Sequence, residues 1–289
     1  MISAINLRRA AWITLLLMPG LGLILVMIGS VFYVAVKQSF GFFNLVGEDE
    51  FSLEHWQRVL DSRAYWRALR YSAYVAIISS LGSVLLAYPL AIWLRRPFRG
   101  SGLVSGMLKA PYFVPGLVAA FLFLNVVAFH GILNQFLMWI GVTDAPIRFQ
   151  NDRNAIGLLF LQIWKNLPLA LILLTGAVQS ISDEVLDAAR DLGAGRFDRF
   201  RKVIAPLTVS AMQAALVIIF IGAAGDFAFQ VTVGPTSVQS MAQHMVFLKD
   251  SFGRWNQAAV VGVSLMVLAL LGSLTLAAIS RFVLKGGKW

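Results

Sequence analysis

The chain has 289 residues, of which 58% are hydrophobic and 13% charged, whereas soluble domains have about 45–50% and about 25%. This composition excludes an ordinary soluble domain and indicates a chain that crosses a membrane several times. Cysteine is absent, which excludes disulfides, thiolate metal sites and a cysteine nucleophile. The formal net charge of +10 fits either a nucleic-acid partner or basic residues on the cytoplasmic side of a membrane.

Six continuous apolar segments are long enough for membrane-spanning helices, which need about 20 residues each. Because the runs are continuous and do not alternate, they predict helices and not the strands of a barrel. We therefore expect an all-α integral membrane protein with spans over residues 12–36, 66–94, 103–129, 155–178, 207–231 and 256–282. The first run is longer than the roughly 7–15 apolar residues of a signal peptide, so we interpret it as a retained span.

Segment 37–65, which joins the first two spans, is amphipathic and carries Phe51, Trp56 and Leu60 at roughly helical spacing. We expect an interfacial helix there that caps the bundle. No low-complexity tract, obvious internal repeat or Pro/Ser-rich linker divides the sequence. The sequence therefore predicts a single transmembrane domain over residues 1–289.

Basic residues concentrate in the segments that lie on one side of the membrane if the N-terminus is cytoplasmic. These segments hold more than half of the 24 Lys and Arg residues, Arg8, Arg95 and Arg201 among them. The positive-inside rule therefore predicts that both termini are cytoplasmic. The same distribution argues against a nucleic-acid partner, because the basic residues are divided among four short pieces and form no single stripe.

The connection between the fourth and fifth spans, residues 182–206, is the most informative segment. Asp183 and Glu184 after Ser182 are typical of a helix start, and Gly193 is typical of a helix end. A second short helix is expected over 196–204, before Pro206 returns the chain to the membrane. The apolar residues of the first helix are predicted to share one face: Val185, Leu186, Ala189 and Leu192. We expect a helix-turn-helix elbow on the cytoplasmic face; a plain structural loop is the alternative.

The elbow resembles the EAA loop of the permease subunits of type I ABC importers, whose pattern reads EAA, three residues, Gly, nine residues, Ile, any residue, Leu-Pro. Asp187-Ala188-Ala189 stands for EAA, Gly193 falls at the required interval, Val203 replaces Ile, and Pro206 holds the proline. Ala205 in place of leucine is a departure. The run 188–194 is similar to the form common in the spermidine/putrescine-like branch, which also holds ferric-iron, thiamine and phosphonate permeases.

This resemblance implies a six-helix permease fold in which the elbow is a coupling helix that docks into a groove of an ATP-binding subunit. The coupling residues that it implies are Asp187, Ala188, Ala189, Gly193, Arg196, Val203 and Pro206. It also implies the partners: two ATP-binding subunits, a second permease subunit of a different chain, and a periplasmic or lipid-anchored substrate-binding protein, all at the bacterial inner membrane. The chain itself has no phosphate-binding loop, so ATP and Mg are expected on the partner ATPase and no cofactor on this chain.

Ionisable residues inside spans cost about 2.5–3.5 kcal/mol each on insertion scales and usually face a polar interior. We therefore expect Lys165 and Asp226, with Asn125 and Gln230, to line a solute pathway; a structural ion pair between Lys165 and Asp226 is the alternative. No convergent catalytic set is visible, which predicts a transport subunit and not an enzyme. Two classes of solute stay open. One is the polyamine-like class, together with phosphonate, iron and thiamine, and the other is a sugar. A membrane scaffold without transport is a further alternative.

Overall fold

The structure is a computed structural model that describes residues 2–44, 49–147, 149, 152 and 154–285. These residues form helices and no strand, in agreement with the predicted all-α class. Five helices in this part of the chain are long and apolar enough to cross a membrane, or six if one bent pair counts as a span. The helices are α1 (Ile2–Ser39), α2 (Glu54–Leu60), α3 (Arg63–Trp93), α4 (Ser101–Lys109), η1 (Ala110–Phe113), α5 (Gly116–Val127), α6 (Ile132–Trp139), α7 (Ile156–Gln179), α8 (Asp183–Asp191), α9 (Arg196–Arg199), η2 (Phe200–Ile204), α10 (Ala205–Leu207), α11 (Val209–Ala224), α12 (Ala228–Thr232), α13 (Met241–Phe252) and α14 (Trp255–Lys285).

Two compact units make up the structure. One comprises Met1–Ser62 and Met245–Val263, and the other comprises Arg63–His244 and Ser264–Trp289. Since both units combine segments that are distant in the sequence, neither is a simple sequential domain. The single transmembrane domain expected over 1–289 stays a prediction.

In the first unit, the end of α1 is fixed by aromatic and polar contacts. The Phe40 ring stacks on Phe51 at 5.5 Å and lies 5.8 Å from the Trp56 ring. The Asn256 amide donates to the Gln38 carbonyl at 3.0 Å. Only α2, seven residues long, is helical within segment 49–62, so the interfacial helix is much shorter than the amphipathic pattern of 37–65 indicated.

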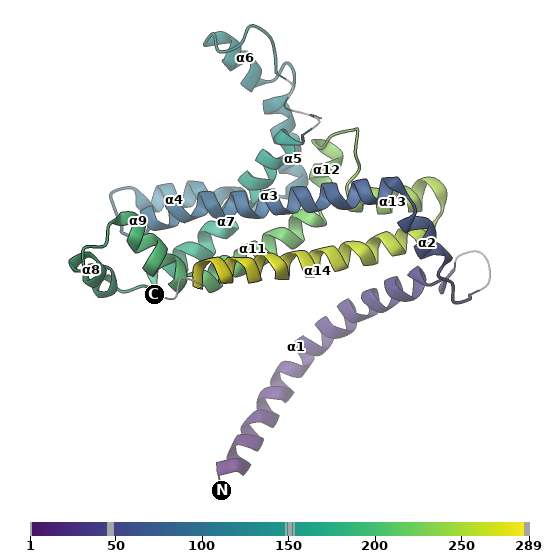
Figure 1. Cartoon of the computed structure of the whole chain (residues 1–289), viewed down its shortest axis with the longest axis horizontal. Helices are drawn as coiled ribbons and strands as arrows, with labels where there is room; N and C mark the ends of the chain where they lie inside the picture. Colours follow the sequence, from purple (N-terminus) through teal and green to yellow (C-terminus); the bar gives the residue numbers. More distant parts are fainter. Residues whose placement is uncertain (1, 45–48, 148, 150–151, 153, 286–289) are drawn as a thin grey trace. The chain divides into compact units, whose positions relative to one another are not determined.

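The second unit is built on α3, α7 and α11, which pack against one another (Figure 1). Small residues on α3 let the helices approach closely, because the Cβ that Gly82 lacks would lie 2.6 Å from Ile163 of α7. The Tyr88 hydroxyl of α3 and Thr208 Oγ1, just before α11, form a hydrogen bond of 3.0 Å. Gly272 of α14 leaves room for the ring of Phe220 of α11.

The third predicted span, over 103–129, is not one helix. The chain passes through α4 and η1, is extended at Val114 (φ −76°, ψ 123°) and starts again as α5 after Pro115. The physical reason is local, since Pro115 disfavours a helical conformation at the preceding residue and has no N–H to donate. This break leaves backbone carbonyls without helical partners at the depth of the membrane, where they need other donors.

The fifth predicted span, over 207–231, is also interrupted. α11 ends at Ala224, Gly225 follows, and α12 begins as a separate short helix. The Asp226 carboxylate accepts a hydrogen bond from the Phe229 N–H at 3.2 Å, which stabilises the start of α12. Apolar composition alone predicted one long helix because the segment stays hydrophobic through the break.

Candidate functional site

The elbow forms at one end of the α3–α7–α11 bundle, where Figure 1 places α8 and α9. α8 begins after Ser182 with two acidic residues in its first turn and ends before Gly193, whose φ is +83°. In this turn the Gly193 N–H donates to the Arg190 carbonyl at 2.9 Å, and the Ala194 N–H donates to the Ala189 carbonyl at 3.0 Å. Glycine is the preferred residue at a left-handed position that ends a helix in this way, because it has no Cβ.

The second arm of the elbow runs from α9 through a π-helical segment, η2, into α10, and is therefore longer than the helix expected over 196–204. Pro206 lies within this arm and has no N–H for a helical bond. The arm meets α11 at an angle of 71°. Thr208 stands at this bend, where its hydroxyl donates to the Ile204 carbonyl at 2.8 Å.

The apolar face predicted for α8 is divided between the bundle and the exterior. Leu186 is buried in the same core cluster as Leu94 and Ile204. By contrast, Leu192 is 89% exposed and Phe197, on α9, is 72% exposed. Val185 is also exposed, at 44%, so Leu186 is the buried member of the predicted face, while Val185 and Leu192 point to the exterior. Phe197 was missed by the sequence analysis, because a single phenylalanine in a basic segment has no periodic signal.

Arg95, just after α3, fixes the elbow to the bundle. Its guanidinium donates to the Asp183 carboxylate at 2.7 Å, to the Ile181 carbonyl at 2.6 Å and to the Val178 carbonyl at 3.3 Å. Only 10% of the Arg95 side chain is exposed, against 73% for its neighbour Arg96. The hydrogen bond from Arg95 lowers the pKa of the Asp183 carboxyl below its usual value. The positive-inside pattern identified Arg95 only as a surface charge, so this role was also missed.

A groove of about 750 Å³ opens between the end of α3 and the two arms of the elbow. The predicted coupling residues Asp187 and Arg196 line the groove. The predicted coupling residues Val203 and Pro206 do not. Val203 packs against the core of the bundle. The groove is lined by Ile92, Trp93, Arg95, Arg96, Leu186, Asp187, Arg190, Ala194, Gly195, Arg196, Arg199 and Ile204.

A polar cluster lies inside the bundle, where α3, α7 and α12 approach. The Gln162 amide donates to the Asp226 carboxylate at 3.0 Å, and the Asn166 amide donates to the Gln162 side-chain oxygen at 3.1 Å. The Tyr71 hydroxyl donates to the Gln230 side-chain oxygen at 3.0 Å. Two of the predicted pathway residues, Asp226 and Gln230, are therefore close to each other on the chain and bonded to facing helices.

The predicted alternative of a Lys165–Asp226 ion pair was wrong: neither side chain forms an ion pair within the described ranges. The Lys165 ammonium instead donates to the backbone carbonyls of Pro111 at 2.7 Å and Tyr112 at 3.0 Å, and also to that of Val114. These carbonyls belong to the break in the third span. A lysine on α7 thus satisfies the acceptors that the break exposes.

Asn125 does not join the polar cluster through any hydrogen bond in the described part of the chain. It is exposed on α5 and its amide donates to the Phe121 carbonyl, one turn earlier on the same helix, at 2.8 Å. This back-bonding satisfies an amide on an apolar helix surface without a tertiary partner.

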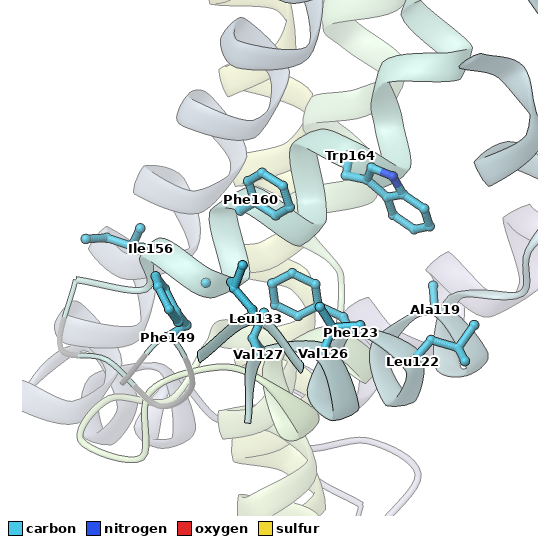
Figure 2. A pocket seen from close by; sticks show the side chains of 11 residues that line it. Ala119, Leu122, Phe123, Val126, Val127, Leu133, Phe149, Ile156, Phe160 and Trp164 are labelled. Atoms are coloured by element: carbon cyan, nitrogen blue, oxygen red, sulfur yellow. The ribbon is translucent and has the colours of Figure 1, made fainter. Parts of the chain in front are cut away.

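A separate apolar pocket of about 570 Å³ lies beside α5 and α7. Figure 2 shows the rings of Phe123 and Phe160 with Leu133 and Phe149 around it. The two phenylalanine rings stack with centroids 5.8 Å apart. The side chains that line this pocket within the described ranges are all uncharged, so its chemistry favours an apolar occupant.

The apolar spans, the charged elbow at one end of the bundle and the polar cluster inside it define a multi-pass membrane protein. Residues 81–285 match the family described as binding-protein-dependent transport system inner membrane component. The chain belongs to this family, which confirms the resemblance inferred from the elbow motif.

Relatives in the family match different shares of the chain. The spermidine/putrescine transport system permease protein PotB of Escherichia coli (strain K12) is 32% identical over 180 residues, which are 61% of this chain and 64% of PotB. The trehalose/maltose transport system permease protein MalF of Thermococcus litoralis is 24% identical over 293 residues, 97% of both chains. The match to PotB thus spans less than two thirds of that relative.

A solved structure shares the fold at lower sequence similarity. It belongs to a bacterial ABC transporter involved in the import of the acidic polysaccharide alginate. The TM-score is 0.77 with 18% identity, and the match covers 97% of this chain and 99% of that one.

Proposed function

We propose that this chain is the permease subunit of an ATP-driven, binding-protein-dependent importer and that it converts the motion of a partner ATPase into alternating access. The observation that carries the proposal is the elbow. Leu192 at the end of its first arm and Phe197 on its second arm are exposed, and Arg95 holds the start of the first arm against the bundle. Exposed apolar side chains rimmed by charges mark protein interaction sites. Family membership makes an ATP-binding subunit the partner that fits this surface.

The proposed assembly contains two ATP-binding subunits, a second permease subunit of a different chain and a periplasmic or lipid-anchored substrate-binding protein. ATP and Mg bind to the ATPase, and this chain holds no cofactor and contacts no nucleic acid. The assembly lies in the bacterial inner membrane with both termini of this chain in the cytoplasm. The family description, an inner membrane component of a binding-protein-dependent system, supports the membrane and the binding protein.

In the proposed mechanism, closure of the ATPase moves α8, and the movement passes to α3 and α7 through Arg95 and the core around Leu186. Asp187, Ala188 and Ala189 contact the ATPase along the first arm, with Arg196 on the second. Gly193 keeps the turn between the arms, and Val203 and Pro206 hold the second arm against the bundle. Rigid packing between α3, α7 and α11 would turn this displacement into rocking of the spans, as in alternating access.

The proposed solute belongs to the polyamine-like class. The 32% identity to PotB supports this assignment, and Asp226 supplies a carboxylate beside Gln230 that suits a cationic solute. Because Lys165 donates to three backbone carbonyls, we assign it a structural role and no contact with the solute. We assign Asn125 a structural role as well, because it is exposed on α5. A sugar is the second candidate, since the match to MalF covers 97% of the chain.

Co-purification tests the coupling surface directly. Replacing Leu192 and Phe197 by serine removes two exposed apolar side chains, each worth about 1.5–3 kcal/mol if buried by a partner. We expect the ATP-binding subunit to bind about 150-fold or more weakly, with loss of spermidine uptake. Leu103→Ser is the matched control, because Leu103 on α4 is 67% exposed and lies outside the elbow. Undiminished retention of the ATPase by the double variant would contradict the proposal and favour a scaffold.

A further inference from the structure

The first two turns of α3 carry a cationic stripe at the end of the helix remote from the elbow. Arg63, Arg67 and Arg70 are spaced by four and three residues, so they share one face, with Trp66 between them. All four side chains are exposed and line an open recess of about 560 Å³. No other residue of the described chain lines this recess.

The stripe is electrostatically unfavourable in the isolated chain. Its arginines form no ion pair with any described residue, and the first turn of α3 contains no acid. Asp152, an acid near this end of the bundle, accepts instead from the N–H groups of Ile156 and Gly157. Like charges one turn apart repel, and cations near a helix N-terminus oppose its dipole. The arrangement therefore calls for an external anion.

The depth of the stripe in the membrane limits what this anion can be. From Arg70 to Trp93, α3 rises about 34 Å, at about 1.5 Å per residue, whereas the hydrocarbon core is about 30 Å thick. With the elbow end of α3 at one interface, the stripe lies at the level of the headgroups on the other side. Trp66 is the residue type that gathers at this interface, and its ring packs edge-on against Tyr65 at 5.2 Å.

We propose that the stripe of Arg63, Arg67 and Arg70, with Trp66, binds the phosphate of an anionic phospholipid headgroup in the outer leaflet. A guanidinium offers a planar fork that binds two phosphate oxygens at once, and neighbouring forks on one helix face can bind the same headgroup. The Arg70 Nε already donates to the Trp66 carbonyl at 3.2 Å, which leaves its terminal nitrogens for the lipid. The proposal requires α3 to span the membrane with its elbow end in the cytoplasm, an orientation that rests on the proposed function, and it does not depend on transport.

Native mass spectrometry of the purified complex, titrated with phosphatidylglycerol or phosphatidylcholine, tests this site. Wild type should bind phosphatidylglycerol more tightly, and Arg67→Gln with Arg70→Gln should weaken that binding about 30-fold, at about 1 kcal/mol per basic residue. The control, Arg99→Gln with Arg201→Gln, removes two exposed charges from the elbow end and should change it less than about threefold. Equal binding by the stripe variant and wild type would overturn the proposal.

Two further measurements do not depend on a charge-removing variant. Arg67→Lys with Arg70→Lys keeps the charge but loses the fork, so we expect partial weakening, about three- to tenfold. Phosphatidylglycerol should also raise the melting temperature of wild type more than phosphatidylcholine does; equal melting temperatures would refute the site. If the glutamine variant keeps the lipid but loses the substrate-binding protein, the stripe binds an acidic protein surface and the lipid proposal is wrong. Neither ATP nor solute is present, so these outcomes are separate from those that test transport.

Discussion

Replacing Arg95 by methionine tests whether this residue links the elbow to the bundle. Methionine keeps an unbranched side chain of similar reach but removes every donor. The Asp183 carboxylate then keeps only the contact with Arg96 at 3.4 Å, and the Val178 carbonyl keeps only the Ile181 N–H at 3.4 Å. A hydrogen bond from a charged donor contributes about 1.5–3 kcal/mol. Because Arg95 is only 10% exposed, its bond to the Ile181 carbonyl is poorly replaced by water, and this bond alone gives about 2 kcal/mol.

A loss of about 2 kcal/mol shifts the equilibrium between the attached and detached elbow about 30-fold. The partner ATPase would still bind and hydrolyse ATP, since the exposed face of the elbow is unchanged. We therefore expect ATP hydrolysis to continue while spermidine uptake falls, so that more ATP is hydrolysed per solute imported. Arg95→Lys should lie between wild type and Arg95→Met, because an ammonium can reach one or two of the acceptors but cannot form the fork.

The assay is uptake and ATP hydrolysis measured together in proteoliposomes that contain the complete transporter. Arg96→Met is the matched control: Arg96 is the next residue, is 73% exposed and makes one contact of 3.4 Å with Asp183. This control should keep nearly the wild-type ratio of uptake to hydrolysis, since exposed ion pairs contribute little. A wild-type ratio in Arg95→Met, or an equal loss in Arg96→Met, would refute the proposed link.

Three other changes probe the elbow and the interior. Gly193→Ala places a Cβ at φ +83° and should cost about 1 kcal/mol, seen as weaker ATPase retention, while Gly176→Ala inside α7 should be neutral or stabilising. Lys165→Met removes the ammonium from three carbonyls, of which that of Pro111 also accepts from the Val114 N–H. It should lower the melting temperature and the uptake of cationic and anionic solutes alike. Asp226→Asn should reduce cationic uptake with little change in the melting temperature. The Asp183 pKa lies below its usual 3.8, so its anchoring contribution is complete above that pH and lost only in stronger acid. Wild-type coupling should accordingly be constant from about pH 5 to 8, and a sharp loss near pH 6 would contradict this.

The parts of the fold that depend on local sequence could be predicted. Apolar run length identified α3, α7 and α14 nearly to their ends, and capping residues around Ser182 and Gly193 identified α8. These signals work because a helix in lipid must form all of its backbone hydrogen bonds within itself, and because helix ends need particular capping residues.

The parts that depend on distant partners could not be predicted. Whether Leu186 or Leu192 is buried depends on how the elbow packs against the bundle. The spacing of apolar residues along the sequence does not determine that packing. The break at Val114 is tolerated because Lys165, 51 residues later, reaches its carbonyl. Arg95 looks like any basic residue at the end of a span until the carbonyls of α7 are beside it.

The two charged residues of the interior follow one rule that connects the fold to the proposed pathway. Lys165 lies where the break in the third span exposes carbonyls, and Asp226 lies where α12 exposes N–H groups. Each charge is therefore opposite in sign to the helix end that it meets. Lys165 has its donors occupied by three carbonyls, but the Asp226 carboxylate accepts from Gln162 and the Phe229 N–H within a cluster that also contains Asn166. Of the two, Asp226 has the surroundings that can exchange a protein donor for a cationic solute, so we expect the proposed pathway to follow α7 and α12 and not the break in the third span.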